Sequence, residues 1–171
     1  MAPVGAEAVD VAGAYDGLAD RGYGYGPAFQ GLRACGGGAE TFAEVELPQH
    51  AGVATGGFGI HPVLLDAALH ALGVANERIE TVLPFSWQGV SLYAAGASRV
   101  RVRLAPAGTG AVSVDLADAS GLPVLSVREL VTRAVSADQL TAALAAAPGA
   151  ASSSTWCGRR SRSRATGLAR A

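Results

Sequence analysis

Residues 61–72 read HPVLLDAALHAL and form the longest uninterrupted helical pattern in the chain. At 100° per residue, aliphatic side chains cover almost the whole circumference, and a helix that is apolar nearly all round is a buried helix. Only Asp66 and His70 break the pattern, and their spacing of four residues places them on one stripe. We expect this helix to run to about Asn76 or Arg78. A carboxyl group and an imidazole on a buried helix require a partner or a function.

The composition indicates a soluble globular protein. Of the 171 residues, 50% are hydrophobic and 16% charged, which suits one domain with a sizeable core and excludes a disordered chain. Residues 1–158 form an acidic globular part with no basic stripe, so nucleic acid is not an expected partner. Residues 159–171 carry five Arg and no acid; a tail that binds nucleic acid or is phosphorylated is a less favoured alternative to a disordered end without function. No apolar run reaches 18 residues and no signal peptide is visible, so we expect a cytoplasmic protein without membrane contact. Cys35 and Cys157 lack metal-ligand spacing and are interpreted as free thiols.

A second distinctive stretch, RGYGYGPAFQ, covers residues 21–30. Its alternating glycines resemble a phosphate cradle, but no strand precedes it and Pro27 removes one of the amides that such a cradle needs. A turn whose aromatic side chains pack on the core is favoured over a direct ligand contact.

The region after residue 30 contains a series of strand patterns separated by turn signals. Apolar and polar residues alternate most clearly at 41–47, 99–104 and 111–117. A longer strand is expected at 122–132, and short ones at 31–35 and 90–93. Pro84 makes a regular central strand through 81–88 unexpected. Close spacing and one polar face predict an antiparallel meander that covers the buried helix. The predicted fold class is therefore α+β, of the hot-dog type, in which a sheet wraps around a long central helix.

The two ends of the chain differ from this central region. We interpret residues 1–20 as a linker or N-terminal extension, with a short helix near 11–18, and residues 21–135 as the folded domain. Residues 136–171 are predicted to be a linker, with a short helix at 137–147, followed by a disordered Arg/Ser tail.

Four signatures occur in an order that resembles the dehydratase domains of modular type I polyketide synthases. The segment YGPAF at 25–29 is similar to the family's YGPxF motif, and HPVLLD at 61–66 with His70 is similar to HPxLLDxxx[QH]. The segment LPFSW at 83–87 matches LPFxW, and the closing strands end near Arg133. Each motif alone is weak, but all of them in sequence order are specific.

The resemblance implies a double hot dog that removes water from a 3-hydroxyacyl chain on an acyl carrier protein, giving a trans-2-enoyl product. In the family, a His of the first hot dog is the base at C2, and an Asp of the second acts on the leaving 3-hydroxyl. That Asp corresponds to Asp66, and His70 corresponds to the Gln or His that supports it. Tyr25, Pro27 and Phe29 would shape the substrate tunnel. No metal or bound cofactor is implied, because the substrate is carried on phosphopantetheine.

The chain departs from the family in one serious respect: the HxxxGxxxxP motif that carries the base His has no match in the sequence. The resemblance therefore implies the second hot dog only, beginning at the linker between the halves, as in a truncated gene product. Its expected partners are an acyl carrier protein and a first hot-dog half that supplies the base, with a homodimer as a further possibility.

The chemistry of Asp66 leaves alternatives open at this point. Desolvation would favour the protonated carboxyl, which could act as a general acid, while the helix N-terminus favours the charged form. Asp66 and His70 could instead simply satisfy each other, and His61 is interpreted as structural. At the level of function, the alternatives are a non-catalytic or dimerising remnant and, less favoured, a hot-dog thioesterase.

Overall fold

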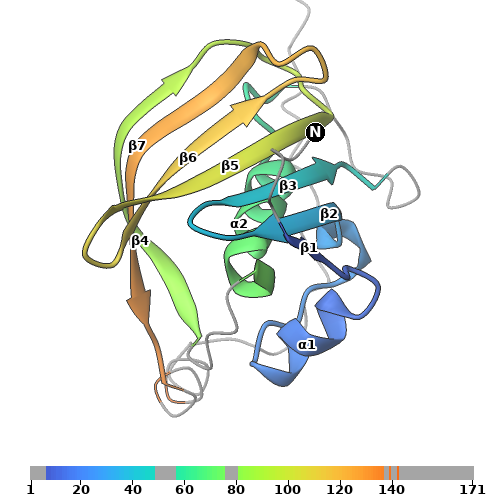
Figure 1. The fold of residues 1–171 in the computed structure, drawn as a ribbon, viewed down its shortest axis with the longest axis vertical. Helices are drawn as coiled ribbons and strands as arrows, with labels where there is room; N and C mark the ends of the chain where they lie inside the picture. The colour runs from blue at the N-terminus through green and yellow to red at the C-terminus, as the bar shows by residue number, and fades with distance from the viewer. Residues whose placement is uncertain (1–6, 49–56, 76–80, 137–138, 140–141, 143–171) are drawn as a thin grey trace, which may run out of the picture. The chain divides into compact units, whose positions relative to one another are not determined.

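The computed structural model describes residues 7–48, 57–75, 81–136, 139 and 142. Most of these residues belong to one antiparallel sheet and the long helix α2 (Figure 1). The elements, in chain order, are β1 (Glu7–Val9), α1 (Ala14–Asp20), the 3-10 helix η1 (Pro27–Phe29), β2 (Leu32–Gly37), β3 (Thr41–Glu46), α2 (Pro62–Ala75), β4 (Val82–Leu92), β5 (Arg99–Gly108), β6 (Ala111–Ala117) and β7 (Pro123–Ala134).

Helix α2 lies on the concave side of the curved sheet in Figure 1, and the main core forms between the two. Leu64, Ala67 and Ala68 of α2 have no exposed surface. They belong to the same buried cluster as inward-facing aliphatic side chains of β2, β3, β5, β6 and β7. Small residues along α2 let the helix approach the sheet closely, and the alternation of the strands supplies the apolar face that covers it. The predicted buried helix and α+β hot-dog fold are confirmed.

The sheet has the strand order β1-β2-β3-β5-β6-β7-β4, and all neighbouring pairs are antiparallel. Strands β5, β6 and β7 follow one another as the predicted meander, with Val102 opposite Leu116 and Leu116 opposite Leu125. Strand β4 does not continue this order, because it pairs with β7 and forms one edge of the sheet.

As predicted, Pro84 does not lie in a regular central strand, but it does lie in a strand, which the sequence pattern did not indicate before residue 90. Strand β4 runs through Pro84 from Val82 to Leu92, and its pairing with β7 shifts in register between Pro84 and Ser86. Proline lacks an N–H and is tolerated in a sheet at an edge strand or a bulge. Pro84 occupies both of these positions at once, and the predicted short strand at 90–93 is the end of this longer one.

Residues 7–20 also belong to the fold, although the sequence pattern suggested an extension there. Strand β1 pairs with β2, with Val9 opposite Cys35, and α1 contacts α2 through Leu18, which is buried. Strand β2 continues through Gly36 and Gly37, where the sequence suggested a break. The predicted helix end beyond Ala75, the Arg/Ser tail and most of the predicted helix at 137–147 lie outside the described residues.

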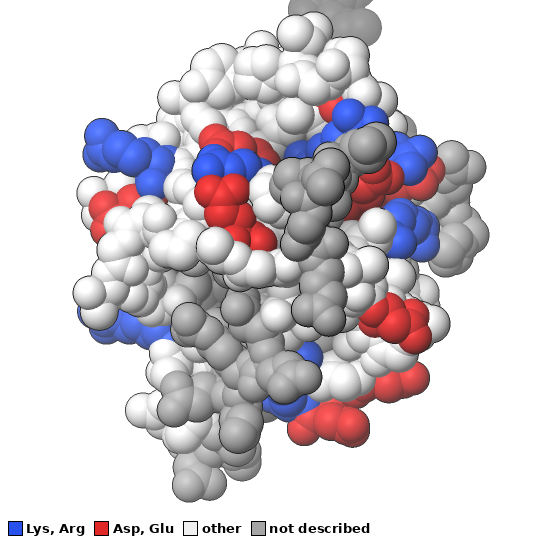
Figure 2. Space-filling view, in the orientation of Figure 1, with Lys and Arg blue, Asp and Glu red and all other residues white. Residues whose placement is uncertain are grey.

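Charged side chains of both signs lie side by side on the face shown in Figure 2. Arg103 of β5 forms ion pairs with Glu40 and, at 3.0 Å, with Asp115 of β6, and Arg99 pairs with Glu44 at 3.0 Å. The hydrogen bonds from Arg103 hold the pKa of the Glu40 carboxyl below its usual range. These exposed pairs neutralise one another across the strands. Among the described helices, none is long and apolar enough to cross a membrane.

Candidate active site

The site begins at the N-terminus of α2, where the side chain of His61 caps the helix. The backbone N–H of Val63 donates a hydrogen bond to Nδ1 of His61 at 3.2 Å, which satisfies one of the amides that a helix start leaves free. The ring of Phe58 packs edge-on against His61 at 4.9 Å. The structural role predicted for His61 is confirmed, and its side chain fixes where the first turn of α2 begins.

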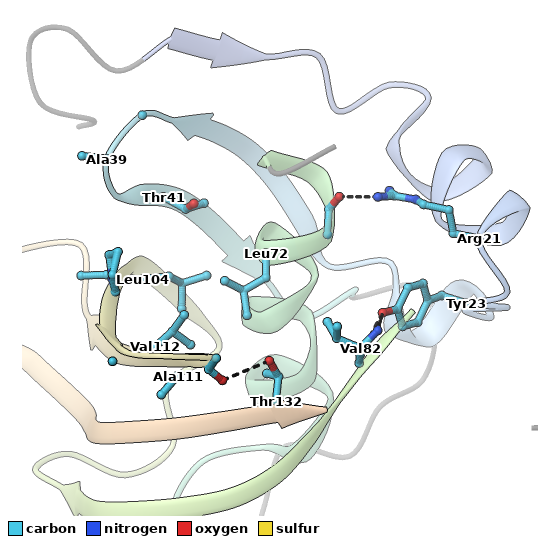
Figure 3. Close-up of a pocket in the computed structure, with 16 residues that line it drawn as sticks. Arg21, Tyr23, Ala39, Thr41, Leu72, Val82, Leu104, Ala111, Val112 and Thr132 are labelled. Carbon is cyan, nitrogen blue, oxygen red and sulfur yellow. Dashed lines mark hydrogen bonds between the residues drawn. The ribbon is translucent and has the colours of Figure 1, made fainter. Parts of the chain in front are cut away.

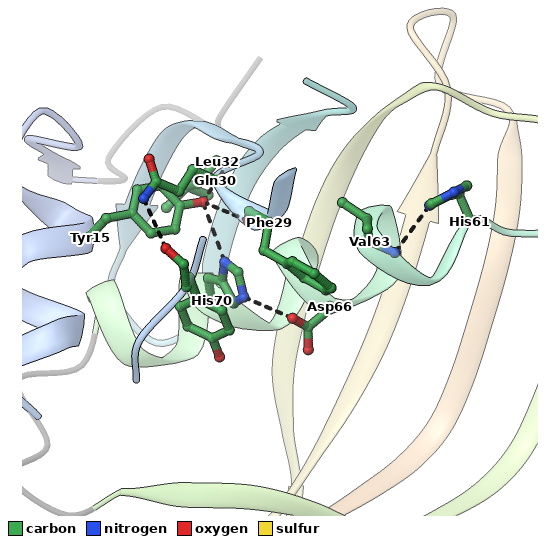
Figure 4. A network of polar contacts seen from close by, with 9 residues as sticks. Tyr15, Phe29, Gln30, Leu32, His61, Val63, Asp66 and His70 are labelled. Atoms are coloured by element: carbon green, nitrogen blue, oxygen red, sulfur yellow. Dashed lines mark hydrogen bonds and ion pairs between the residues drawn. The ribbon is translucent and has the colours of Figure 1, made fainter. Parts of the chain in front are cut away.

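Asp66 and His70 form the predicted pair on one face of α2. Nε2 of His70 lies 3.2 Å from Oδ2 of Asp66 (Figure 4). The His70 side chain is 1% exposed, whereas that of Asp66 is 40% exposed. The carboxyl therefore lies less deeply than the helical pattern led us to expect, and the imidazole beneath it is the buried member of the pair.

Tyr15, on α1, completes the contacts of His70. Its hydroxyl lies 3.3 Å from Nδ1 of His70, and its ring meets the imidazole edge-on at a centroid distance of 5.7 Å. The backbone N–H of Leu32 donates to the same hydroxyl at 2.9 Å. Both ring nitrogens of the buried imidazole thus have a partner, so the network links three elements: α1, β2 and α2 (Figure 4).

Tyr25 packs on the other side of His70. The two rings lie 3.8 Å apart between centroids with an angle of 37° between their planes, and Tyr23 stacks on Tyr25 at 6.0 Å. Burial, with the nearby Asp66 carboxyl as the second cause, raises the pKa of the Tyr25 phenol far above its usual range. Tyr25 is therefore a neutral, partly buried wall of the site at physiological pH.

Pro27 and Phe29 lie in η1, the single turn that follows Tyr25 and contacts α2. Pro27 is at the start of the turn, where its fixed φ suits a helical conformation. Phe29 is 38% exposed. Neither residue lines the cavity next to Asp66, so of the three residues expected to shape the substrate tunnel, only Tyr25 lies on that cavity in the described chain.

A cavity of about 90 Å³ opens beside Asp66 and His70. Most of its remaining wall is apolar and includes Leu18, Leu69, Leu83, Pro84 and Leu130. Binding sites for small molecules commonly have several hundred Å³, so this cavity alone is small for a complete site. Among the described residues, no group of three or more His, Cys, Asp and Glu side chains could hold a metal ion.

A second cavity, of about 170 Å³, is drawn in Figure 3. It shares part of its wall with the first cavity. The shared residues are Tyr23, Leu72, Gly73, Val82 and Thr132. Arg21 borders this second cavity, and its guanidinium donates to the carbonyl oxygen of Gly73 at 2.7 Å. The two neighbouring cavities together follow α2 from Asp66 toward the C-terminal end of the helix.

Sequence reasoning missed two tyrosines of this site. Tyr15 was assigned to an extension outside the domain, and Tyr23 was treated only as part of a turn. The Tyr23 hydroxyl donates to the carbonyl oxygen of Val82 at 2.8 Å and accepts from its N–H at 2.6 Å, so it holds the beginning of β4. The one feature of the sequence that could have indicated a role for Tyr15 was its position as an aromatic residue within the predicted helix at 11–18.

The chain matches the family model described as the polyketide synthase dehydratase N-terminal domain over residues 2–142. It is 61% identical over 143 residues to the mycoketide-CoA synthase of Mycobacterium tuberculosis, covering 83% of this chain and 3% of that protein. A dehydratase structure solved for the borrelidin and fluvirucin polyketide synthases shares 51% identity with a TM-score of 0.73, covering 79% of this chain and 49% of the other. A dehydratase variant from the CurK module of curacin polyketide synthase shares 29% identity with a TM-score of 0.69, covering 78% and 50%. The chain thus spans about half of the solved dehydratases and a small part of the whole synthase.

Proposed function

Because the chain belongs to the polyketide synthase dehydratase family, we propose that it is the Asp-bearing half of a dehydratase that acts on a 3-hydroxyacyl chain held by an acyl carrier protein. The observation that carries this proposal is the contact between Asp66 and His70 on the central helix, whose Oδ2 and Nε2 atoms are 3.2 Å apart. Both residues line a mostly apolar cavity. The carboxyl is accessible and the imidazole is buried, an arrangement that suits a reacting acid and its support.

The motifs assign the chain to the second hot dog, although the matching family model is described as the N-terminal domain. The HPxLLDxxx[QH] signature is present, and the sequence has no HxxxGxxxxP segment. Coverage of about half of each solved dehydratase is consistent with either half, so the assignment rests on the residues themselves.

In the proposed reaction, a His of the other hot dog removes the proton from C2 and the bond between C3 and the hydroxyl oxygen breaks. Asp66 donates a proton to the leaving hydroxyl, so that water and a trans-2-enoyl thioester are formed. Nε2 of His70 holds the carboxyl in place through their contact, and the apolar cavity beside Asp66 accepts part of the acyl chain. The phosphopantetheine arm of the carrier protein presents the substrate, and no further cofactor takes part.

Two variants of the CurK dehydratase, one Asp→Asn and the other His→Phe, are each described as inactive. In that protein the two positions lie further apart than this chain is long. This supports the proposal that Asp66 needs a His from a polypeptide segment outside these 171 residues.

The test offers a 3-hydroxyacyl-pantetheine thioester to the purified chain, alone and mixed with a first hot dog that carries HxxxGxxxxP. We expect water loss only in the mixture, and at least about a hundredfold lower rate for Asp66→Asn, because a general acid contributes on that order or more. Water loss by the chain alone would contradict the requirement for a second half. Cleavage of the thioester would point to a thioesterase, and no reaction in any mixture would point to a non-catalytic remnant.

A further inference from the structure

Tyr15 is the one side chain bonded to Nδ1 of His70 in the described part of the chain. Its hydroxyl has a single proton and already accepts the N–H of Leu32 at 2.9 Å. Two acceptors compete for that proton: Nδ1 of His70 at 3.3 Å and the carbonyl oxygen of Phe29 at 3.4 Å. Where this proton goes decides which nitrogen of His70 carries hydrogen, because a neutral imidazole has one N–H.

If Tyr15 donates to Nδ1, that nitrogen is an acceptor and the imidazole proton is on Nε2. Nε2–H then donates to Oδ2 of Asp66 across 3.2 Å. Oδ2 is thereby occupied as an acceptor, while Oδ1 has no hydrogen-bond partner among the described residues. In this arrangement every polar atom of Tyr15 and His70 is satisfied without placing a positive charge on the buried ring.

If Tyr15 donates to Phe29 instead, Nδ1 must carry the hydrogen and Nε2 presents a lone pair to Asp66. A lone pair at 3.2 Å repels a carboxylate, or else it draws the proton of a neutral carboxyl onto Oδ2. In both cases the carboxyl has no proton on its accessible side to give to a departing hydroxyl.

We propose that Tyr15 is a positioning residue that fixes His70 as the Nε2–H tautomer, and that this leaves Oδ1 of Asp66 as the oxygen that acts on the leaving hydroxyl. The Tyr25 ring, at 3.8 Å from the imidazole, keeps His70 in the orientation that this requires. The assignment of Oδ1 rests on the function proposed above, whereas the tautomer is a property of this chain alone.

The first test measures the tautomer of His70 by NMR in chain labelled with ¹⁵N-histidine, with His70→Gln identifying the signals. In Asp66→Ala, the contact between Nδ1 of His70 and the Tyr15 hydroxyl remains while the contact at Nε2 is lost, and we expect the Nε2–H tautomer to remain the major one. In Asp66→Ala with Tyr15→Phe, the Nε2–H to Nδ1–H ratio should fall about tenfold, the effect of one lost hydrogen bond.

A matched control is Tyr93→Phe, which removes an exposed tyrosine hydroxyl whose partner is Ser126 on β7. It should leave the ratio unchanged. An Nδ1–H majority in Asp66→Ala would overturn the proposal, and so would equal ratios with and without the Tyr15 hydroxyl. Because Asp66→Ala keeps Tyr15, an Nδ1–H majority in that variant overturns the proposal even if Tyr15→Phe does not fold.

The second test uses the mixture with the first hot dog. Tyr15→Phe should lower the rate of water loss about tenfold with His70 in place, and by a smaller factor in a His70→Gln background, because an amide has no tautomer to select. Equal losses in both backgrounds would contradict the positioning role. If no mixture loses water, the proposed function fails, while the NMR result still decides the tautomer.

Discussion

At the scale of single residues, the buried thiol of Cys35 gives the chain a pH-dependent stability. Cys35 lies on β2 with its Sγ 4.0 Å from the carbonyl oxygen of Ala71, and burial raises the pKa of the thiol to about 11. An unfolded thiol has a pKa of about 8.5, so unfolding releases a proton between these values. The corresponding stability is complete below about pH 8.5 and is lost as the pH rises toward 11.

We therefore expect the free energy of unfolding to fall more steeply from pH 8 to pH 11 in the wild type than in Cys35→Ala. Urea unfolding at several pH values measures both slopes, and the tyrosines of the core affect the two proteins equally. Parallel slopes would contradict the prediction. The absolute stability of Cys35→Ala does not enter the comparison.

Single residues also show how far the sequence predicts the site. Asp66 and His70 are neighbours because helical geometry places residues four apart on one face, so their contact could be predicted. Tyr15 meets His70 from 55 positions away, and no local pattern encodes that contact. The exposure of Asp66 was equally unpredictable, since it depends on which walls surround the helix.

At the scale of elements, the close approach of α2 to the strands depends on Gly31. A Cβ at this position would lie 2.8 Å from the carbonyl oxygen of Glu46 and 3.2 Å from Cβ of Ala67. Gly31→Ala should therefore destabilise the fold by about 1–3 kcal/mol, the usual effect of overpacking. Gly38→Ala is the control, because no atom lies within 4 Å of a Cβ built at that position. Its free energy of unfolding should differ from that of the wild type by less than about 0.5 kcal/mol.

Urea unfolding midpoints with unchanged slopes measure both variants. An unchanged free energy of unfolding for Gly31→Ala would contradict the prediction, because it would mean that β3 and α2 can move apart without losing stability.

The elements themselves were largely predictable, because alternation and helical spacing are local properties of the chain. The strand through Pro84 was not predicted, for a tertiary reason: the missing N–H of proline matters only if a strand lies on that side, and edge position is not visible in local sequence.

At the scale of the whole molecule, β4 is an edge strand whose exposed surface is largely apolar, and beyond the irregularity at Pro84 it has no charged residue that would blunt this edge. Natural edge strands are commonly blunted by charged residues, yet β4 contains none between Val82 and Leu92. Tyr23 holds only the beginning of the strand, at Val82. The large apolar residues that β4 exposes are Leu83, Phe85, Trp87, Val90 and Leu92. Such a surface suits an interface, and in the chain alone it favours self-association.

We expect the wild-type chain to form larger species as its concentration rises in sedimentation velocity, and Val90→Lys to reduce them. Val90 is 54% exposed and lies toward the C-terminal end of β4, so a lysine there adds charge to the edge at little cost to the core. Leu122→Lys is the matched control, because Leu122 is 64% exposed but precedes β7 and lies outside the β4 edge. A monomeric wild type at all concentrations would contradict the prediction, as would equal effects of the two lysines. If β4 is the surface that a first hot dog covers, adding that half should suppress self-association of the wild type as effectively as Val90→Lys does.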